Sequence, residues 1–270
     1  MIKVTSIAAE WAEAQSRYIE SVQNEPYYNA EEDILNQEDY YGTIDFGKED
    51  LPKQVHDLLV RTHNRQLDYS PHRYVYPWVD LQENLKLKSL YSGKGIDPLK
   101  AIDQDLKLLQ TIHESGFHSN ERVIFNTEHV VPQSWFEGRQ PMKGDLHHLF
   151  ACEPACNSMR SNFPYYDFEA YVPEMEAAGV RNGCGMAEQE KFEPEYGKGI
   201  AARAVFYFAV RYKNVLMIDE KMDMQILLRW HEENPVTVYE KHRNASIQAL
   251  QGNRNPFIDF PEHAKKMLDS

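Results

Sequence analysis

The stretch Asn126-Thr127-Glu128-His129-Val130-Val131-Pro132 places a carboxylate next to an imidazole at the end of a β-like run. Two polar segments follow it along the chain, Gly144-Asp145-Leu146-His147-His148-Leu149 and Cys156-Asn157-Ser158-Met159-Arg160-Ser161-Asn162. Together they supply hard oxygen ligands, an imidazole base and a guanidinium, which are the groups that metal-assisted hydrolysis of a phosphate ester requires. We therefore expect residues 126–162 to contain the functional site.

The three segments predict a ββα unit. Residues Ile124 to Val131 favour a strand that Pro132 stops, Asp145 to Phe150 favour a return strand, and Glu153 to Arg160 favour a short helix. A helix packed beside a two-stranded ribbon brings the end of the first strand close to the helix. We therefore predict an α+β fold, a helix-rich single domain built around a ββα-metal core near residues 122–165.

The rest of the chain reads mainly as helix. Apolar residues recur at helical spacing in six stretches: Ile7–Gln23, Leu51–Thr62, Pro98–Glu114, Gly199–Tyr212, Asp223–Glu233 and Val236–Leu250. Three other interpretations are an extended segment at Tyr74–Tyr76, a helix at Asp167–Ala178 and a surface loop at Gly179–Gly199. The acidic residues 1–40 are predicted to form a helical N-terminal arm, and residues 41–270 to form the main domain.

Composition bounds the class of protein. The 270 residues are 42% apolar, enough for a substantial core, and no run approaches the roughly 20 apolar residues of a membrane span. With 29 Lys+Arg against 42 Asp+Glu, the net charge of −13 opposes indiscriminate adhesion to polyanions. The N-terminus lacks the layout of a secretory signal. We expect a cytoplasmic protein if the chain is complete, and a secreted or periplasmic one if a signal has been removed.

The three cysteines, Cys152, Cys156 and Cys184, cannot all pair within one chain, so no disulfide framework is predicted. Buried thiols are the favoured interpretation. A zinc site that adds His147 or His148 to the cysteines is the alternative, although structural zinc sites usually have tighter paired spacing.

The chemistry predicted for the ββα unit needs two metal ligands and a base. Glu128 and Asn157 offer hard oxygens to Mg²⁺, for which Mn²⁺ or Ca²⁺ could substitute in binding, and they leave coordination positions for water and phosphate. Neutral His129 would take a proton from the attacking water. Since adjacent strand residues face opposite ways, both Glu128 and His129 can serve only if the strand end twists or bulges.

Four more side chains are assigned to supporting roles. Asp145 is expected to hold the loop that carries His129 and so to orient the imidazole. One of His147 and His148 is expected to face the site; the sequence does not decide which, and His148 is included among the candidate site residues. Arg160 lies three residues after Asn157 on one helix face and could bind phosphate. Arg139, in the loop between the strands, could stabilise charge on the transferring phosphate.

These residues resemble the bacterial endonuclease I family of ββα-metal (His-Me finger) nucleases. The likeness covers roughly Leu51 to His263, and it rests on Phe125 to Phe136, Asp145 to Leu149, Asn157 to Asn162, Leu90-Tyr91-Ser92-Gly93, and a later block from Leu228 to Asp259. The resemblance implies Glu128 and Asn157 as metal ligands, His129 as general base and, less tightly, Arg139 as a catalytic residue. It implies cleavage of DNA, and often RNA, with little sequence preference and 5′-phosphate ends. Many members are exported and disulfide-bonded, and this chain departs from them in lacking a visible signal and a disulfide set.

Three basic residues of the later block, Lys241, Arg243 and Arg254, are candidates for contacts to the phosphate backbone, although Arg254 could instead brace the terminal segment. Two other functions remain open: a catalytically silent module that binds nucleic acid or protein, and a zinc-binding protein. The sequence also leaves open the oligomeric state and an inhibitor protein as partner.

Overall fold

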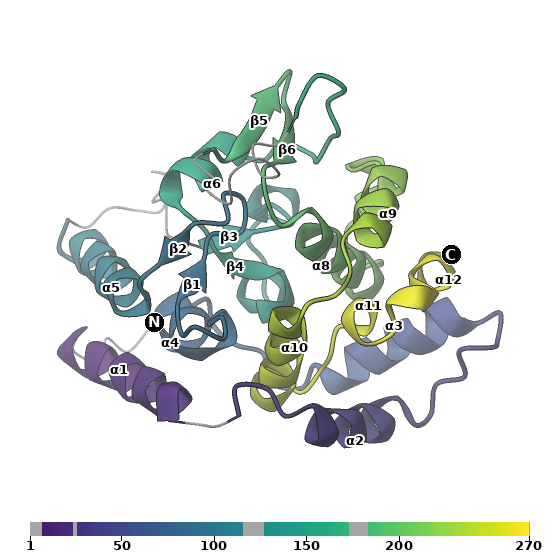
Figure 1. Ribbon diagram of the computed structural model, residues 1–270, viewed down its shortest axis with the longest axis horizontal. Helices are drawn as coiled ribbons and strands as arrows, with labels where there is room; N and C mark the ends of the chain where they lie inside the picture. The colour runs from purple at the N-terminus through teal and green to yellow at the C-terminus, as the bar shows by residue number, and fades with distance from the viewer. Residues whose placement is uncertain (1–6, 24–25, 116–126, 173–182, 270) are drawn as a thin grey trace.

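Helix α8 (Lys198–Arg211) lies at the centre of the computed structural model, which describes residues 7–23, 26–115, 127–172 and 183–269 (Figure 1). Every residue from Gly199 to Phe208 is buried. Most of its side chains are small, aliphatic or aromatic, so neighbouring elements can pack against all of its faces. The predicted helix at Gly199–Tyr212 is confirmed, and it is the core helix of the fold.

The largest hydrophobic cluster surrounds α8. The α-helices that pack on it are α3 (Leu51–Thr62), α9 (Met224–Glu233), α11 (Pro256–Asp259) and α12 (Ala264–Leu268). Helix α10 (Val238–Gln251) begins at a capping box in which Thr237 and Glu240 satisfy each other's backbone N–H groups, and it ends at Gly252, whose φ of 95° is left-handed. The helices predicted at residues 51–62, 223–233 and 236–250 are confirmed.

A second hydrophobic cluster joins the N-terminal helix to the middle of the chain. Helix α1 (Ile7–Gln23) packs on α4 (Pro71–Tyr74), on the π-helical turn η1 (Val75–Val79) and on α5 (Pro98–Ser115). Pro71 occupies the first position of α4, where its fixed φ favours a helix start. The extended segment predicted at Tyr74–Tyr76 is therefore wrong, and the helices predicted at residues 7–23 and 98–114 are confirmed.

Helix α2 (Ala30–Tyr41), the second helix of the predicted arm, is joined to the C-terminal part of the chain by buried polar groups. Asp33 forms an ion pair with Arg254 at 2.8 Å, and the Tyr41 hydroxyl donates to Asp259 at 2.8 Å. Asp33 and Arg254 are almost entirely inaccessible to solvent. Both helices of the arm thus pack on the main body of the molecule.

In the described part of the chain the strands form three short antiparallel pairs: β1 (Leu87–Lys88) with β2 (Gly95–Ile96), β3 (Thr127–His129) with β4 (Leu149–Ala151), and β5 (Gly185–Glu188) with β6 (Lys191–Pro194). The 3₁₀ turns are Gln133–Trp135, Met142–Gly144, Leu146–His148, Ile218–Glu220 and Pro261–His263. With helix α6 (Pro154–Arg160), they complete an α+β fold, as predicted.

Two predictions for the segment after α6 are wrong where the structure describes it. Residues 167–172 form no helix, and residues 173–178 of that predicted helix lie outside the described range. The predicted loop at Gly179–Gly199 contains the β5–β6 hairpin, whose Phe192 N–H donates to Pro164 O at 3.0 Å. Among the described helices, none is both long and apolar enough to cross a bilayer.

Candidate active site

The ββα unit is formed by β3, β4 and α6. Glu128 pairs with Phe150 and His129 with Leu149, one residue to one residue, so β3 contains no bulge over this range, and of the two expected distortions only a twist of the strand end remains. The return strand begins later than predicted because Asp145 caps a 3₁₀ turn at Leu146–His148, its side chain accepting from the His147 N–H at 3.1 Å. His147 and His148 therefore do not alternate across a strand.

Helix α6 docks on the open edge of β3. The Asn157 Nδ2 donates to Thr127 O at 2.9 Å, and the Arg160 guanidinium donates to His129 O at 3.4 Å. Residues three apart on a helix share a face, and carbonyls two apart on a strand point to the same edge. The predicted common face of Asn157 and Arg160 is confirmed, and it is turned toward the strand that carries Glu128 and His129.

Glu128 is buried, with 1% of its surface exposed. Its Oε1 accepts a hydrogen bond from the Tyr91 hydroxyl at 2.7 Å and lies 3.2 Å from an Arg160 nitrogen. Burial raises the pKa of Glu128 to about 7, and the opposing effects of Arg160 and the Tyr91 hydrogen bond are smaller. This carboxylate is therefore incompletely compensated by its protein neighbours.

His129 is held by a backbone carbonyl on one side and an amide on the other. Its Nε2 lies 3.0 Å from Lys143 O, which can only accept, so Nε2 carries the proton and Nδ1 is the basic nitrogen. Gln133 Nε2 lies 3.1 Å from Nδ1 and donates to it. Burial lowers the pKa of His129 well below its ordinary value, and the neighbouring His148 lowers it further. The imidazole is thus neutral at pH 7.

Aromatic rings surround His129. The Tyr69 ring stacks on it at a centroid distance of 5.0 Å and an angle of 29°, and the His148 ring meets it edge-on at 5.3 Å. His148 is therefore the histidine that packs toward His129, a question that the sequence left open. The His147 Nε2 lies 3.2 Å from Asn253 O instead, and the His147 ring contacts Tyr207.

Asp145 makes no bond to His129, so the predicted carboxylate–imidazole contact is wrong. Its Oδ2 accepts from the hydroxyls of Tyr207 and Tyr212 at 2.7 and 2.8 Å, and its Oδ1 accepts from Gln251 Nε2 at 2.8 Å. Asp145 caps the turn and braces it against α8 and α10. The orienting role expected of Asp145 belongs to the Lys143 carbonyl.

Two basic residues predicted to contact phosphate are buried in ion pairs. Arg254 is fully buried between Asp33 and Asp259, and Arg243 is paired with Asp80 and donates to Leu146 O at 2.7 Å. A buried guanidinium with carboxylate partners cannot reach a nucleic-acid backbone, so these two predictions are wrong. Burial in ion pairs is not visible in a sequence pattern.

Three other basic residues predicted to contact phosphate differ in how far they are exposed. Arg160 is buried against Glu128 and β3, which fits a role in support of the metal ligand better than contact with phosphate. Arg139 lies in the loop after β3 with its side chain 53% exposed, and its Nε donates to Phe136 O at 3.1 Å. Lys241 is exposed on α10. The proposed phosphate contacts of Arg139 and Lys241 stay predictions, whereas burial excludes direct contact of Arg160 with phosphate as it does for Arg243 and Arg254.

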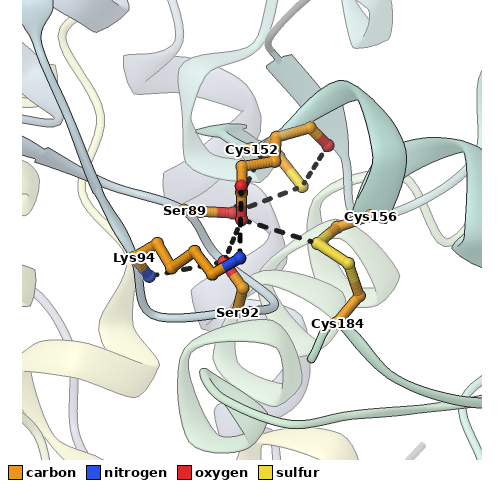
Figure 2. The surroundings of a disulfide bond; sticks show 7 residues. Ser89, Ser92, Lys94, Cys152, Cys156 and Cys184 are labelled. Carbon is orange, nitrogen blue, oxygen red and sulfur yellow. Dashed lines mark hydrogen bonds and ion pairs between the residues drawn. A yellow bond between two sulfur atoms is a disulfide. The ribbon is translucent and has the colours of Figure 1, made fainter. Parts of the chain in front are cut away.

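The cysteines form a disulfide that the sequence analysis did not predict. Cys156 on α6 is bonded to Cys184, just before β5, and the free Cys152 is buried beside Ser89 (Figure 2). An odd cysteine count excludes a complete set of pairs but does not exclude one pair. The disulfide removes two of the three thiolates that a zinc site would need, and the described residues contain no cluster of three His, Cys, Asp or Glu side chains suited to a metal ion.

Three side chains that contact the site went unassigned in the sequence. The Tyr91 hydroxyl donates a hydrogen bond to Glu128, while Gln133 and Tyr69 contact His129. Gln133 lies four residues after His129, a local signal that could have suggested contact. Tyr91 belongs to the Leu90–Gly93 motif, which contributed to the resemblance without a role.

Fold and site together define an α+β protein built on a ββα unit, with a carboxylate and an imidazole on its first strand and an amide on its helix. The chain belongs to the endonuclease I family, whose family model matches residues 48–262.

Curated proteins with nuclease names are similar to the chain. It is 32% identical over 161 residues to an extracellular ribonuclease of Bacillus amyloliquefaciens, a match that covers 53% of each protein. It is 24% identical over 235 residues to a periplasmic deoxyribonuclease of Aeromonas hydrophila, which covers 68% of this chain and 94% of that protein. An Endonuclease-1 of Buchnera aphidicola subsp. Baizongia pistaciae is 26% identical over 185 residues, covering 59% of this chain and 73% of that protein. The chain thus spans about half the length of the Bacillus ribonuclease.

Proposed function

We propose that this chain is a divalent-metal-dependent endonuclease that hydrolyses phosphodiester bonds in DNA, and in RNA as well, with little sequence preference. Membership of the endonuclease I family and the nuclease names of its relatives support the reaction class. The observation that carries the mechanism is the pairing of the two His129 ring nitrogens, one with a carbonyl and one with an amide donor.

His129 is the general base of the proposed reaction. Because Lys143 O holds the protonated Nε2, the lone pair of Nδ1 is fixed in one direction, where it accepts from Gln133 Nε2 until the attacking water takes the place of that amide. Burial keeps the imidazole neutral, so it can take a proton from water at neutral pH. The water oxygen then attacks phosphorus while the bond to the 3′ oxygen breaks, which leaves a 5′-phosphate and a 3′-hydroxyl.

Glu128 and Asn157 are the residues that would hold Mg²⁺, or Mn²⁺ or Ca²⁺ in its place. A carboxylate and an amide oxygen are hard donors that suit these cations. Thr127 O fixes the Asn157 nitrogen, so the oxygen is the atom of this amide suited to ligation. When bound, the cation would offset charge on the phosphate and on the leaving oxygen.

Arg139 is proposed to contact the phosphate from the loop between the strands. Its half-exposed side chain is close to the surface that a polymer must approach, unlike the buried Arg160. A local cation of this kind counters the repulsion expected from the net charge of −13.

An extracellular or periplasmic location is proposed for the activity. The Cys156–Cys184 disulfide favours an oxidising compartment, and relatives bear the words extracellular and periplasmic in their names.

The test is the conversion of supercoiled plasmid to nicked and linear forms by purified protein with Mg²⁺, with chelator, and with the variant His129→Ala. Chelator should abolish cleavage, and His129→Ala should lower the rate roughly 10²–10⁴-fold, as expected for loss of a general base. His263→Ala, which alters a partly exposed histidine paired with Glu262, is the matched control and should cleave as wild type does.

Equal activity of wild type and His129→Ala would end the assignment of the base. A folded wild-type protein that binds plasmid and a single-stranded RNA without cutting either would favour a catalytically silent binding module instead.

A further inference from the structure

The loop that carries the Leu90-Tyr91-Ser92-Gly93 motif is fixed to the ββα unit from several sides. The Leu90 N–H donates to Ala151 O of β4 at 2.9 Å, and the Tyr196 N–H donates to Tyr91 O at 2.8 Å. Gly197 has a φ of 74°, and a Cβ there would lie 2.5 Å from Leu90 O, so the close approach requires glycine. The backbone of Tyr91 is therefore held in one place relative to β3.

The side chain of Tyr91 is equally constrained. Its ring is fully buried and meets Phe192 of the hairpin edge-on at 4.9 Å. Its hydroxyl lies 2.7 Å from Glu128 Oε1 and 2.7 Å from the Tyr165 hydroxyl. Since the Tyr91 proton goes to the carboxylate, Tyr165 must donate to the Tyr91 oxygen. The result is a directed chain of hydrogen bonds that ends on one oxygen of Glu128.

The contacts that hold the Glu128 side chain fall on one of its oxygens. The hydrogen bond from the Tyr91 hydroxyl and the ion pair with the Arg160 guanidinium are both made by Oε1. A carboxylate that is fixed through one oxygen presents the other in a set direction. Mutation of a group that orients a ligand in this way typically costs about 10–100-fold in metal affinity.

We infer that Tyr91 is a positioning residue for the metal site: with Arg160 it commits Glu128 Oε1 and directs Oε2 to a divalent cation. The inference rests on the proposed function, since it assumes that Glu128 is a ligand. It assigns to the Leu90–Gly93 motif a role in cation affinity rather than in contact with nucleic acid.

A purely structural role for the Tyr91 hydroxyl makes a different prediction. It would lower the free energy of unfolding and leave the affinity for the cation unchanged. A direct titration of metal into protein without substrate separates the two roles, because it reads cation binding and not turnover.

The experiment is a titration of the whole protein with Mn²⁺, followed by calorimetry or by the electron paramagnetic resonance signal of free Mn²⁺. The variant Tyr91→Phe keeps the ring and removes the hydroxyl, and it should raise the dissociation constant for Mn²⁺ about tenfold. Tyr41→Phe is the matched control, because it also removes a hydroxyl that donates to a buried carboxylate, Asp259, but away from the ββα unit. It should bind Mn²⁺ as wild type does.

The outcomes separate this inference from the proposed function. If wild type binds Mn²⁺ and Tyr91→Phe binds it equally well, the positioning role is overturned while the metal site stands. If wild type binds no Mn²⁺, or if Glu128→Ala binds it as tightly as wild type, the metal site itself is overturned, and the inference with it. Tyr165→Phe removes the hydroxyl behind Tyr91 and should raise the dissociation constant by a smaller factor. It decides the question if Tyr91→Phe does not fold.

Discussion

Two buried clusters of arginine and carboxylate groups differ in how completely their polar atoms are paired. Arg254 donates to both oxygens of Asp33 and to both oxygens of Asp259, at 2.8 to 3.3 Å. Among the described residues, Arg160 instead donates to backbone carbonyls, and its carboxylate contact is with Glu128 Oε1 at 3.2 Å. The complete pairing of Arg254 fits a structural brace, whereas the contacts on Oε1 of Glu128 fit its proposed role as a metal ligand.

The comparison predicts that neutralising Glu128 lowers the cleavage rate and that neutralising Asp33 lowers the free energy of unfolding. Glu128→Gln keeps the shape of the side chain and an Oε1 that can accept from Tyr91 and Arg160. We expect a loss of roughly three orders of magnitude in cleavage rate, because a charged ligand for the cation is lost, with little change in the free energy of unfolding. Plasmid cleavage and denaturation by urea measure the two quantities on one preparation. Full activity in Glu128→Gln would break the comparison.

Asp33→Asn is the corresponding variant in the cluster of Arg254, Asp33 and Asp259. It removes one of the two negative charges that compensate buried Arg254, and we expect the free energy of unfolding to fall by about 3 kcal/mol, as when a buried ion pair loses a partner. The folded fraction should cleave plasmid at the wild-type rate. A wild-type urea midpoint in Asp33→Asn would show that the cluster is not a brace.

Local patterns account for what could be predicted of this fold. Helices such as Leu51–Thr62 and Ile7–Gln23 were predicted at their observed bounds because their apolar residues follow the helical period over several turns. The polar segment at Asp145 had no such period. Its capping bond to His147 competed with the strand ladder, and the histidines went into a 3₁₀ turn.

The candidate site shows the same division between local and distant information. Glu128 and His129 lie on a predicted strand and Asn157 and Arg160 on a predicted helix of one ββα unit, so the geometry of that unit predicted their approach. Tyr91 reaches Glu128 from 37 positions away, a contact that depends on tertiary packing alone. The same is true of the Cys156–Cys184 bond, which the count of three cysteines concealed.

The Cys156–Cys184 disulfide is expected to stabilise the part of the fold that holds Glu128 and Arg160. It ties α6, which carries Asn157 and Arg160, to the β5–β6 hairpin across a separation of 28 residues. The double variant Cys156→Ser/Cys184→Ser should lose about 3 kcal/mol of unfolding free energy, the usual scale for a loop of this size. Reductant should destabilise the wild type by a similar amount in thermal melts and leave the double variant unchanged. An equal response of wild type and the double variant to reductant would show that the loss of stability does not come from this disulfide.

A third buried polar cluster lies at the turn Leu146–His148, where His147 and Asp145 rather than an arginine are at the centre. Burial lowers the pKa of His147 to about 4, against the raising effect of Asp145. Since the unfolded pKa is near 6.5, the unfolded chain binds more protons between pH 6.5 and pH 4, so stability present above pH 6.5 is lost as the pH falls through this window. This one group should contribute a slope of up to about 1.4 kcal/mol per pH unit. Urea denaturation at several pH values should show that slope in wild type and a shallower one in His147→Gln, because glutamine cannot take up the proton. Equal slopes would mean that His147 stays neutral in both states or is charged in both, and that other buried histidines such as His63 set the acid limit.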